Sequence, residues 1–288
     1  MLDLHPKTRP VIDFPLALGE CPTWDEASQS LWFIDITAPK LHHLHPVSGK
    51  LVSYAMPESI GSFGFCMDHR LVVGLRNGVH YFDPRSQKLT LLVDPEPDNP
   101  HTRLNDGKIG PDGCFWVGSM DDRKIREPIA ALYRVTPDGQ CTKKRDGLRI
   151  SNGLAWSPDG RKMIHADTMA DEAMIYDFDA STGALSHGRS FCRLDEATGR
   201  PDGAAMDREG FYWSAGVSAS CLNRIAPDGT IERKLHIPMN APTMPCFGGP
   251  DLRTLYVTSL ARGGQDGTVL ALEVDVPGTV SPRFGAHI

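Results

Sequence analysis

The sequence lacks a long hydrophobic run and an excess of positive charge, and each absence excludes a class of protein. No stretch of its 288 residues approaches the ~18 consecutive apolar residues that a membrane-spanning helix needs. The chain has 30 Lys and Arg against 36 Asp and Glu, a formal net charge of −6, and no basic face for a polyanion is evident. We therefore expect neither a membrane protein nor a nucleic-acid-binding protein.

Paired cysteines and a secretion signal are also missing. The seven cysteines are scattered, odd in number and without a CxxC pair, so they do not indicate a disulfide framework. Residues 1–10 include charged residues and proline where a signal peptide would have an apolar core of about 7–15 residues. We expect reduced thiols, a cytoplasmic location and, as the default, a monomer.

Helical periodicity is scarce, whereas turn residues are plentiful. No convincing helical stretch exceeds about 10 residues. The chain contains 28 glycines and 23 prolines among its 288 residues, or about 18%. The ordinary combined usage of these two residues is about 12%. Many tight turns imply many short strands, and this predicts an all-β protein.

One pattern recurs six times along the chain: an apolar stretch, a turn rich in Asp, Pro and Gly, and two further strand-like stretches. The residue just before the turn marks each copy, and the separations between successive copies are 43, 43, 46, 50 and 43 residues. A period of ~40–50 residues is the length of a four-stranded propeller blade. We predict one domain over residues 1–288, a six-bladed β-propeller. The six marker residues are Trp24, Met67, Gly110, Trp156, Met206 and Gly249.

Polar residues occupy the same position in four of the six copies. Four residues before the marker stand Glu20, Asp106, Asn152 and Asp202, with Phe63 and Pro245 in the other two copies. In a propeller this position lies near one mouth of the central channel, so the four side chains should form a ring. Clustered oxygens repel one another unless a cation lies between them, and they suit Ca²⁺, Mg²⁺, Mn²⁺, Fe²⁺ or Zn²⁺. The alternative is that Asp-Gly and Asn-Gly are merely turn dipeptides.

The phrases around these positions resemble the SMP-30/gluconolactonase/regucalcin-like family, and the phrase Pro245-Cys246-Phe247-Gly248-Gly249-Pro250 is similar to that of its bacterial sugar lactonases. The resemblance extends from about residue 14 to 275 and rests on four phrases together: Gly19-Glu20-Cys21-Pro22, Arg103-Leu104-Asn105-Asp106-Gly107-Lys108, Ser151-Asn152-Gly153 and Pro201-Asp202-Gly203.

The resemblance implies a hydrolase that opens sugar lactones with one catalytic divalent metal. It implies that Glu20, Asn152 and Asp202 are the metal ligands and that Arg103 and Asn105 contact the sugar, with Asn105 near the metal. In one respect the chain departs from the family: a glutamate is not evident in the substrate loop, where Asp121-Asp122-Arg123 stands. The identity of the sugar is therefore open.

These residue types suit attack of water on a lactone carbonyl. A divalent metal with open positions can polarise the carbonyl and lower the pKa of water. Asp202 could also act as the general base, but a carboxylate beside a cation has a lowered pKa and is a weak base. Arg103 offers planar donors to sugar hydroxyls or to the developing carboxylate.

Other candidates fit catalysis less well. The histidines at 42, 43 and 45 alternate between strand faces, which favours a solvated outer strand over a metal site. Cys21 is expected to be a small buried residue. Ser151 lacks the GxSxG context of a nucleophilic serine. Asp167 and Thr168 could support Asn152 or be purely structural.

Two other functions remain open. The same scaffold could be a metal-dependent esterase or phosphotriesterase, or a non-enzymatic propeller that binds calcium or another ligand, because propellers have many functions.

Overall fold

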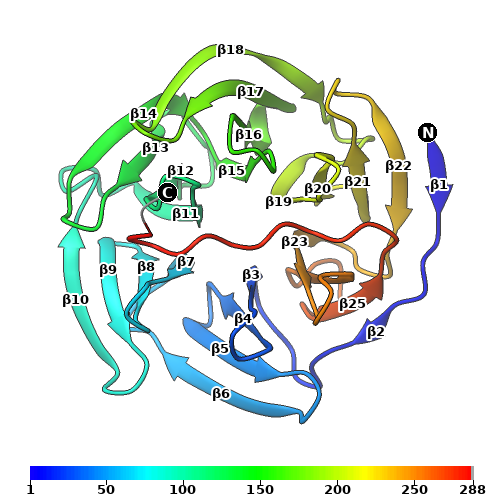
Figure 1. Ribbon diagram of the computed structural model, residues 1–288, viewed down its shortest axis with the longest axis horizontal. Coiled ribbons are helices and arrows are strands. Elements are labelled where there is room, and N and C mark those ends of the chain that lie inside the picture. The colour runs from blue at the N-terminus through cyan, green and yellow to red at the C-terminus, as the bar shows by residue number, and fades with distance from the viewer. Residues whose placement is uncertain (287–288) are drawn as a thin grey trace.

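Six antiparallel sheets surround a central axis as the blades of a propeller, which confirms the predicted fold (Figure 1). The structure is a computed structural model that describes residues 1–286; the predicted domain also included residues 287–288, which lie outside the described residues. Each blade places one strand against the axis. These inner strands are β3 (Gly19–Asp25), β7 (Ile60–Phe65), β11 (Thr102–Ile109), β15 (Ser151–Trp156), β19 (Pro201–Met206) and β23 (Pro242–Gly248).

The remaining strands form successive layers outward from the axis. The second strands are β4 (Ser30–Asp35), β8 (Leu71–Leu75), β12 (Phe115–Asp121), β16 (Lys162–Asp167), β20 (Tyr212–Gly216) and β24 (Thr254–Ser259). The third strands are β5 (Lys40–His45), β9 (Gly78–Asp83), β13 (Ala130–Val135), β17 (Glu172–Asp179), β21 (Cys221–Ile225) and β25 (Val269–Glu273). The outer strands of the first five blades are β6 (Lys50–Ala55), β10 (Lys88–Val93), β14 (Cys141–Leu148), β18 (Ala184–Arg193) and β22 (Ile231–His236).

Burial decreases from the axis outward, as the sequence pattern requires. All residues of β4 and β12 are buried, whereas most of β6 is exposed. The apolar side chains form clusters between neighbouring blades, and aromatic pairs join several of these interfaces. The ring centroids of Trp116 and Trp156 are 6.0 Å apart, and those of Trp213 and Phe247 are 5.7 Å apart. The blades therefore cohere mainly through apolar packing of one sheet face on the next.

The sixth blade takes its outer strand from the beginning of the chain. β2 (Arg9–Pro10) pairs with β25, and β1 (Leu2–Leu4) adds a fifth, parallel strand to the fifth blade beside β22. Pro10 is tolerated there because an outermost strand leaves one row of backbone groups unpaired. On the inner side, the Thr243 hydroxyl donates to the Gly19 carbonyl at 2.5 Å and joins the last inner strand to the first. Both ends of the chain thus close the ring.

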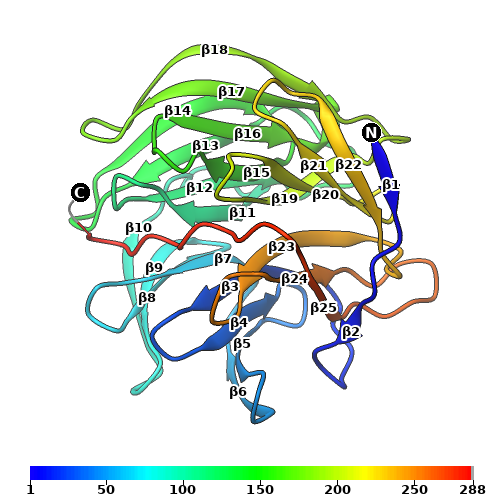
Figure 2. The same ribbon diagram turned by 45° about the vertical axis from the view of Figure 1, so that its right-hand side comes forward.

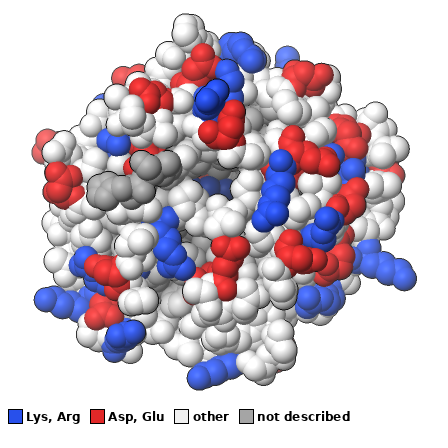
Figure 3. Space-filling model, in the orientation of Figure 1, with Lys and Arg blue, Asp and Glu red and all other residues white. Residues whose placement is uncertain are grey.

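Residues 276–286, here called the strap, cross one face of the propeller from β25 to the opposite side of the ring (Figures 1 and 2). Gly278 pairs with Asp207 and Phe284 with Cys66, so both ends of the strap are held by backbone contacts. A cavity of about 340 Å³ opens under the strap, where the space-filling view shows a central hollow (Figure 3). The strap therefore marks one mouth of the channel, the mouth at which the inner strands end.

The one helical element among residues 1–286 is η1 (Thr168–Ala170), a 3₁₀ turn that follows β16. The described part of the chain contains no helix with the length and apolar character of a membrane span.

Candidate functional site

Each inner strand loses its register with the second strand at the same height, near the mouth opposite the strap. The breaks fall between Glu20 and Thr23, Ile60 and Ser62, Leu104 and Gly107, Asn152 and Ala155, Pro201 and Ala204, and Pro242 and Met244. Such a bulge redirects side chains that a regular strand would point between the blades. All four predicted ring positions lie at these breaks, which explains how acids and an amide can point toward the axis.

Two of the bulges use left-handed backbone. Gly153, directly after Asn152, has φ of 67°, and a Cβ there would lie 2.5 Å from the Tyr212 hydroxyl oxygen. Cys21, directly after Glu20, has φ of 46°, which is unusual for a residue other than glycine. Backbone strain of this kind gathers at functional sites, where surrounding packing holds it in place.

The orientation of the Asn152 amide follows from its partners. Thr168 donates its hydroxyl proton to the Pro201 carbonyl at 2.7 Å, so its oxygen must accept from Asn152 Nδ2 at 2.8 Å. Asn152 Oδ1 therefore faces the opposite way, where it accepts from Asn105 Nδ2 at 3.1 Å. Thr168 thus fixes the orientation of the Asn152 amide, so the contact expected between these two residues is present.

The two expected sugar-contacting residues form the next part of the same hydrogen-bond chain. Asn105 also donates to the Ser151 carbonyl at 3.0 Å, and its Oδ1 accepts from Arg103 at 2.9 Å. Because the oxygen of Asn105 is occupied by Arg103, Asn105 presents its NH₂ group, not an oxygen, to the Asn152 side. This arrangement places Asn105 beside one of the expected metal ligands.

Burial raises the pKa of three carboxylates near the axis, and the charge of Asp106 adds to the shift of the other two. Burial raises the pKa of Glu20 well above its usual value, and the charges of Asp202 and Asp106 add to the effect. Burial, followed by the charge of Asp106, raises the pKa of Asp202 to about 8. Burial also raises the pKa of Asp106, against the opposing charge of Lys108. Acids that oppose one another's ionisation in this way make a strong site for positive charge.

The donor set suits a hard divalent cation. Asp106 Oδ1 is buried and has no hydrogen-bond partner, while its Oδ2 accepts from the Leu154 amide at 3.2 Å. Glu20 Oε2 accepts from the Cys21 amide at 2.9 Å. Among residues 1–286, no three His, Cys, Asp or Glu side chains form a metal-binding group by themselves. The oxygens near one another here are thus carboxylates together with the amide oxygen of Asn152.

A lysine crosses the channel below these acids. Lys108 on β11 donates from Nζ to the carbonyl oxygen of Ala204 on β19, and it also lines the cavity under the strap. Burial lowers the pKa of Lys108, and the nearby charge of Asp106 opposes this shift. If Glu20, Asp106 and Asp202 are ionised, Lys108 and one dication together balance their charge.

The profile of the SMP-30/Gluconolactonase/LRE-like region matches residues 18–261. The chain belongs to this family. The 6-deoxy-6-sulfogluconolactonase of Pseudomonas putida is 37% identical, covering 95% of this chain and 97% of that protein. The regucalcin of Xenopus laevis is 32% identical over 88% of this chain and 86% of its own length.

A solved member of the family has the same fold. The crystal structure of a calcium-binding protein, regucalcin from Agrobacterium tumefaciens, superposes with a TM-score of 0.94 at 29% identity. The match covers 99% of this chain and 100% of that one. The six-bladed architecture is thus shared over essentially the whole length of both chains.

In this SMP-30/gluconolactonase family member the weaker candidates, Ser151 and Cys21, are buried beside the expected ligands. Ser151 is fully buried, and its hydroxyl oxygen lies 2.7 Å from Nε2 of His165, so water and substrate do not reach it. Cys21 is 1% exposed, and burial raises the pKa of its thiol to about 12. A thiol of such high pKa is a poor nucleophile.

The expectation that the histidine cluster is solvated is wrong for His42. β5 is a third strand, not an outer one, and His42 is buried with its ring stacked on Phe33 at 4.8 Å. His43 lies on the other face and stacks on Trp32 at 4.0 Å. These histidines act as aromatic packing residues.

Their burial predicts an acid-sensitive fold. Desolvation lowers the pKa of both His42 and His43 to about 4, from about 6.5 in the unfolded chain. Their contribution to stability is complete above the unfolded value and is lost as the pH falls toward 4. We expect His43→Phe to reduce the fall in Tm between pH 7 and 4.5 by about 2 to 4 °C. Thermal melts would check this, and an equal reduction in the exposed-site control His101→Phe would contradict it.

Two residues near Arg103 were not predicted as site residues from the sequence. Asp122 lies 3.4 Å from Nε of Arg103, and Arg76 lies 2.6 Å from Asp122 on its other side. Asp122 belongs to the loop in which the family glutamate is not evident. This departure from the family pattern could have pointed to Asp122. Arg76, at the turn between β8 and β9, carried no signal because its relation to Asp122 exists only in the folded ring.

Proposed function

We propose that this protein is a lactonase that opens a sugar lactone to the sugar acid, with one divalent cation held by Glu20, Asn152 and Asp202. What supports the proposal is that the buried acids Glu20 and Asp202 lie close enough to interact, and that Thr168, which orients the Asn152 amide, also donates to the Pro201 carbonyl next to Asp202. Support comes also from the relative that is named 6-deoxy-6-sulfogluconolactonase and shares 37% of its residues.

The cation would polarise the lactone carbonyl and lower the pKa of water, and it would also neutralise the facing acids. Glu20 and Asp202 bring two negative charges and Asn152 a neutral oxygen. Asn152 is already oriented by Thr168, so little reorganisation is needed when the site fills.

The residues of this chain supply binding and proton transfer. Arg103 donates to the substrate, because its guanidinium is fixed by Asn105 and by the Leu104 carbonyl at 3.0 Å. Asp202 takes the proton of the attacking water. Its pKa, raised by burial in the absence of a cation, would fall when a cation binds, so Asp202 acts both as a ligand and as a base of moderate strength.

The reaction balances without a further reactant. The water oxygen forms a bond to the carbonyl carbon, and one water proton moves to Asp202. The bond between the carbonyl carbon and the ring oxygen then breaks, and the ring oxygen takes that proton back from Asp202 to become a hydroxyl. The product is a sugar acid, whose carboxylate Arg103 can contact before release.

The decisive measurement is pH-stat hydrolysis of several sugar lactones, corrected for spontaneous opening. We expect turnover that falls at least about 100-fold after chelation and returns when Ca²⁺, Zn²⁺, Mn²⁺, Fe²⁺ or Mg²⁺ is added back singly. Aryl esters and a phosphotriester in the same assay test the esterase alternative. If no ester opens above the blank while calcium still raises the Tm, the protein is a calcium-binding propeller and the lactonase proposal is wrong.

A further inference from the structure

A continuous chain of polar contacts leads from the candidate cation site to the solvent-exposed rim. It begins at Asn152 and passes through Asn105, Arg103 and Asp122 to Arg76. Asn152, Asn105 and Arg103 are 3%, 7% and 8% exposed, whereas the Asp122 and Arg76 side chains are 34% and 39% exposed. A substrate whose carbonyl lies beside Asn152 would extend outward along this chain toward Arg76.

The loop that carries Asp122 is held firmly. Its neighbour Asp121 is fully buried at its side chain and accepts from the Arg123 guanidinium at 2.6 Å and from the Glu127 amide at 2.7 Å. The Asp122 amide donates to the His101 carbonyl at 2.9 Å. Asp122 is therefore presented at a defined position.

At the outer end of the chain of contacts, one carboxylate lies between two guanidinium groups: Asp122 is 3.4 Å from Arg103 and 2.6 Å from Arg76. Arg76 also lines a hollow of about 250 Å³ with Asp94, Glu96 and Asp98, but among residues 1–286 its ion pair is with Asp122. Glu96 is engaged elsewhere, since it accepts from Ser119 and Tyr133 at 2.8 Å each.

The contact of Asp122 with Arg76 can be exchanged for a contact with a ligand. Both side chains are about a third exposed, and ion pairs at such positions contribute only about 0–1 kcal/mol. Guanidinium groups bind phosphate, sulfonate and carboxylate through paired hydrogen bonds. A carboxylate held between two arginines thus occupies the place that an anionic group of a substrate would take.

We propose that Arg76 and Arg103 form a subsite for an anionic substituent on the sugar carbon farthest from the lactone carbonyl, and that Asp122 is the internal anion that this substituent displaces. The inference rests on the proposed lactonase function and deepens it, because it selects phosphate-, sulfonate- or carboxylate-bearing lactones over neutral ones. It also assigns opposite effects to the two partners: Arg76 attracts the substituent, whereas Asp122 competes with it.

The test compares kcat/KM for glucono-1,5-lactone with that for its 6-phosphate, its 6-sulfonate and the corresponding 6-carboxylate. We expect the anionic lactones to be preferred about 10-fold or more, with the preference reduced by salt. Arg76→Gln should lower the ratio of anionic to neutral turnover about 10-fold. Asp122→Asn should raise the ratio about 5-fold, because it removes the competing charge. The matched control is Arg85→Gln, an exposed arginine at the other end of the same blade, which should leave the ratio unchanged.

The signs of the two effects separate a subsite from a structural ion pair. If Arg76 and Asp122 merely stabilise the loop, both variants move the ratio in the same direction or not at all, and the proposal is overturned. It is also overturned if the parent protein opens neutral lactones as fast as anionic ones.

A binding measurement keeps this outcome distinct from failure of the lactonase proposal. Isothermal titration with 6-phosphogluconate and gluconate needs no turnover. We expect 6-phosphogluconate to bind at least about 10-fold more tightly and Arg76→Gln to remove the difference. Equal affinities for the two acids would refute the subsite even in a protein that hydrolyses no lactone.

Discussion

Asp202→Asn is expected to lower lactone hydrolysis by roughly 100- to 1,000-fold, because it removes a charged cation ligand and the proposed base together. The metal-free variant should nevertheless be at least as stable as the parent at pH 8. Burial raises the pKa of Asp202 from 3.8 to about 8, so folding favours the protonated acid. The stability that this group contributes is complete below its unfolded pKa of about 4 and is lost as the pH rises toward 8.

Thermal melts in chelator at pH 5 and pH 8, together with kcat/KM, would check both parts. The parent should lose more stability over this interval than Asp202→Asn, and a divalent cation should raise the Tm of the parent more than that of the variant. Asp13→Asn, at an exposed position, is the matched control. Full turnover by Asp202→Asn would remove Asp202 from both of its proposed roles.

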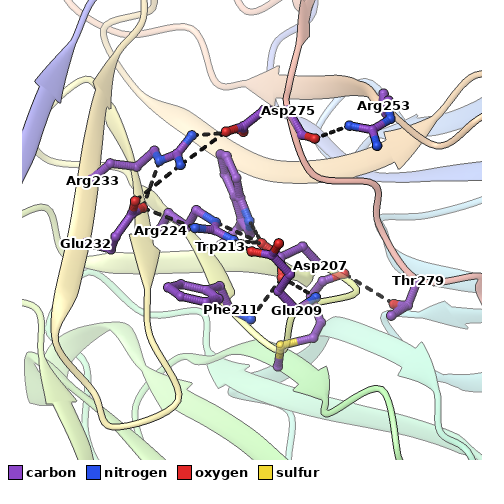
Figure 4. A network of polar contacts seen from close by, with 11 residues as sticks. Asp207, Glu209, Phe211, Trp213, Arg224, Glu232, Arg233, Arg253, Asp275 and Thr279 are labelled. Atoms are coloured by element: carbon purple, nitrogen blue, oxygen red, sulfur yellow. Dashed lines mark hydrogen bonds and ion pairs between the residues drawn. The ribbon is translucent and has the colours of Figure 1, made fainter.

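The largest expected loss of stability comes from a buried ion pair beneath the strap (Figure 4). Asp207 is fully buried and accepts from Trp213 Nε1 at 2.9 Å and from Arg224 at 2.8 Å. Arg224 is 3% exposed, lies over the Phe211 ring at 3.6 Å and also contacts Glu209 at 2.8 Å. Removing Asp207 would leave the Trp213 indole N–H and the Nε–H of Arg224 without their partner, while the terminal guanidinium nitrogens keep Glu209 and Glu232 at 2.8 and 3.2 Å.

We expect Asp207→Ala to cost about 3–5 kcal/mol of unfolding free energy, the range for breaking one side of a buried pair. Urea denaturation would measure it. The double variant Asp207→Ala with Arg224→Met should recover part of the loss, because the buried guanidinium that has lost its buried carboxylate is then replaced by an apolar side chain. Asp251→Ala, which breaks an exposed pair with Arg253 at 4.0 Å, should cost less than about 1 kcal/mol. A similar cost for Asp207→Ala and Asp251→Ala would contradict this account.

The repeat made the propeller predictable, because each blade must bury the same faces against its neighbours. The phase of that repeat also located Glu20, Asp106, Asn152 and Asp202 at equivalent positions, since one bulge recurs in every inner strand. The order of residues along the chain was therefore enough to predict features that every blade repeats.

Features that depend on contacts between distant segments could not be predicted. β2 is two residues long and contains Pro10, so it has no strand pattern of its own; its pairing with β25 follows only from the missing edge of the last blade. Likewise Arg76 and Asp122 meet across 46 positions of sequence. His42 is polar, yet it is buried, because stacking on Phe33 and a 2.8 Å contact with Ser53 satisfy its ring.

The pairing of β2 with β25 has a consequence for how the chain folds during synthesis. Residues 9–10 leave the ribosome long before residues 269–273, which they must join. Until then the sixth blade cannot form its pair between β2 and β25. Contacts of such large sequence separation make folding slow. A nascent chain halted earlier, before β23, should remain an open arc in which the first and fifth blades expose apolar faces to chaperones.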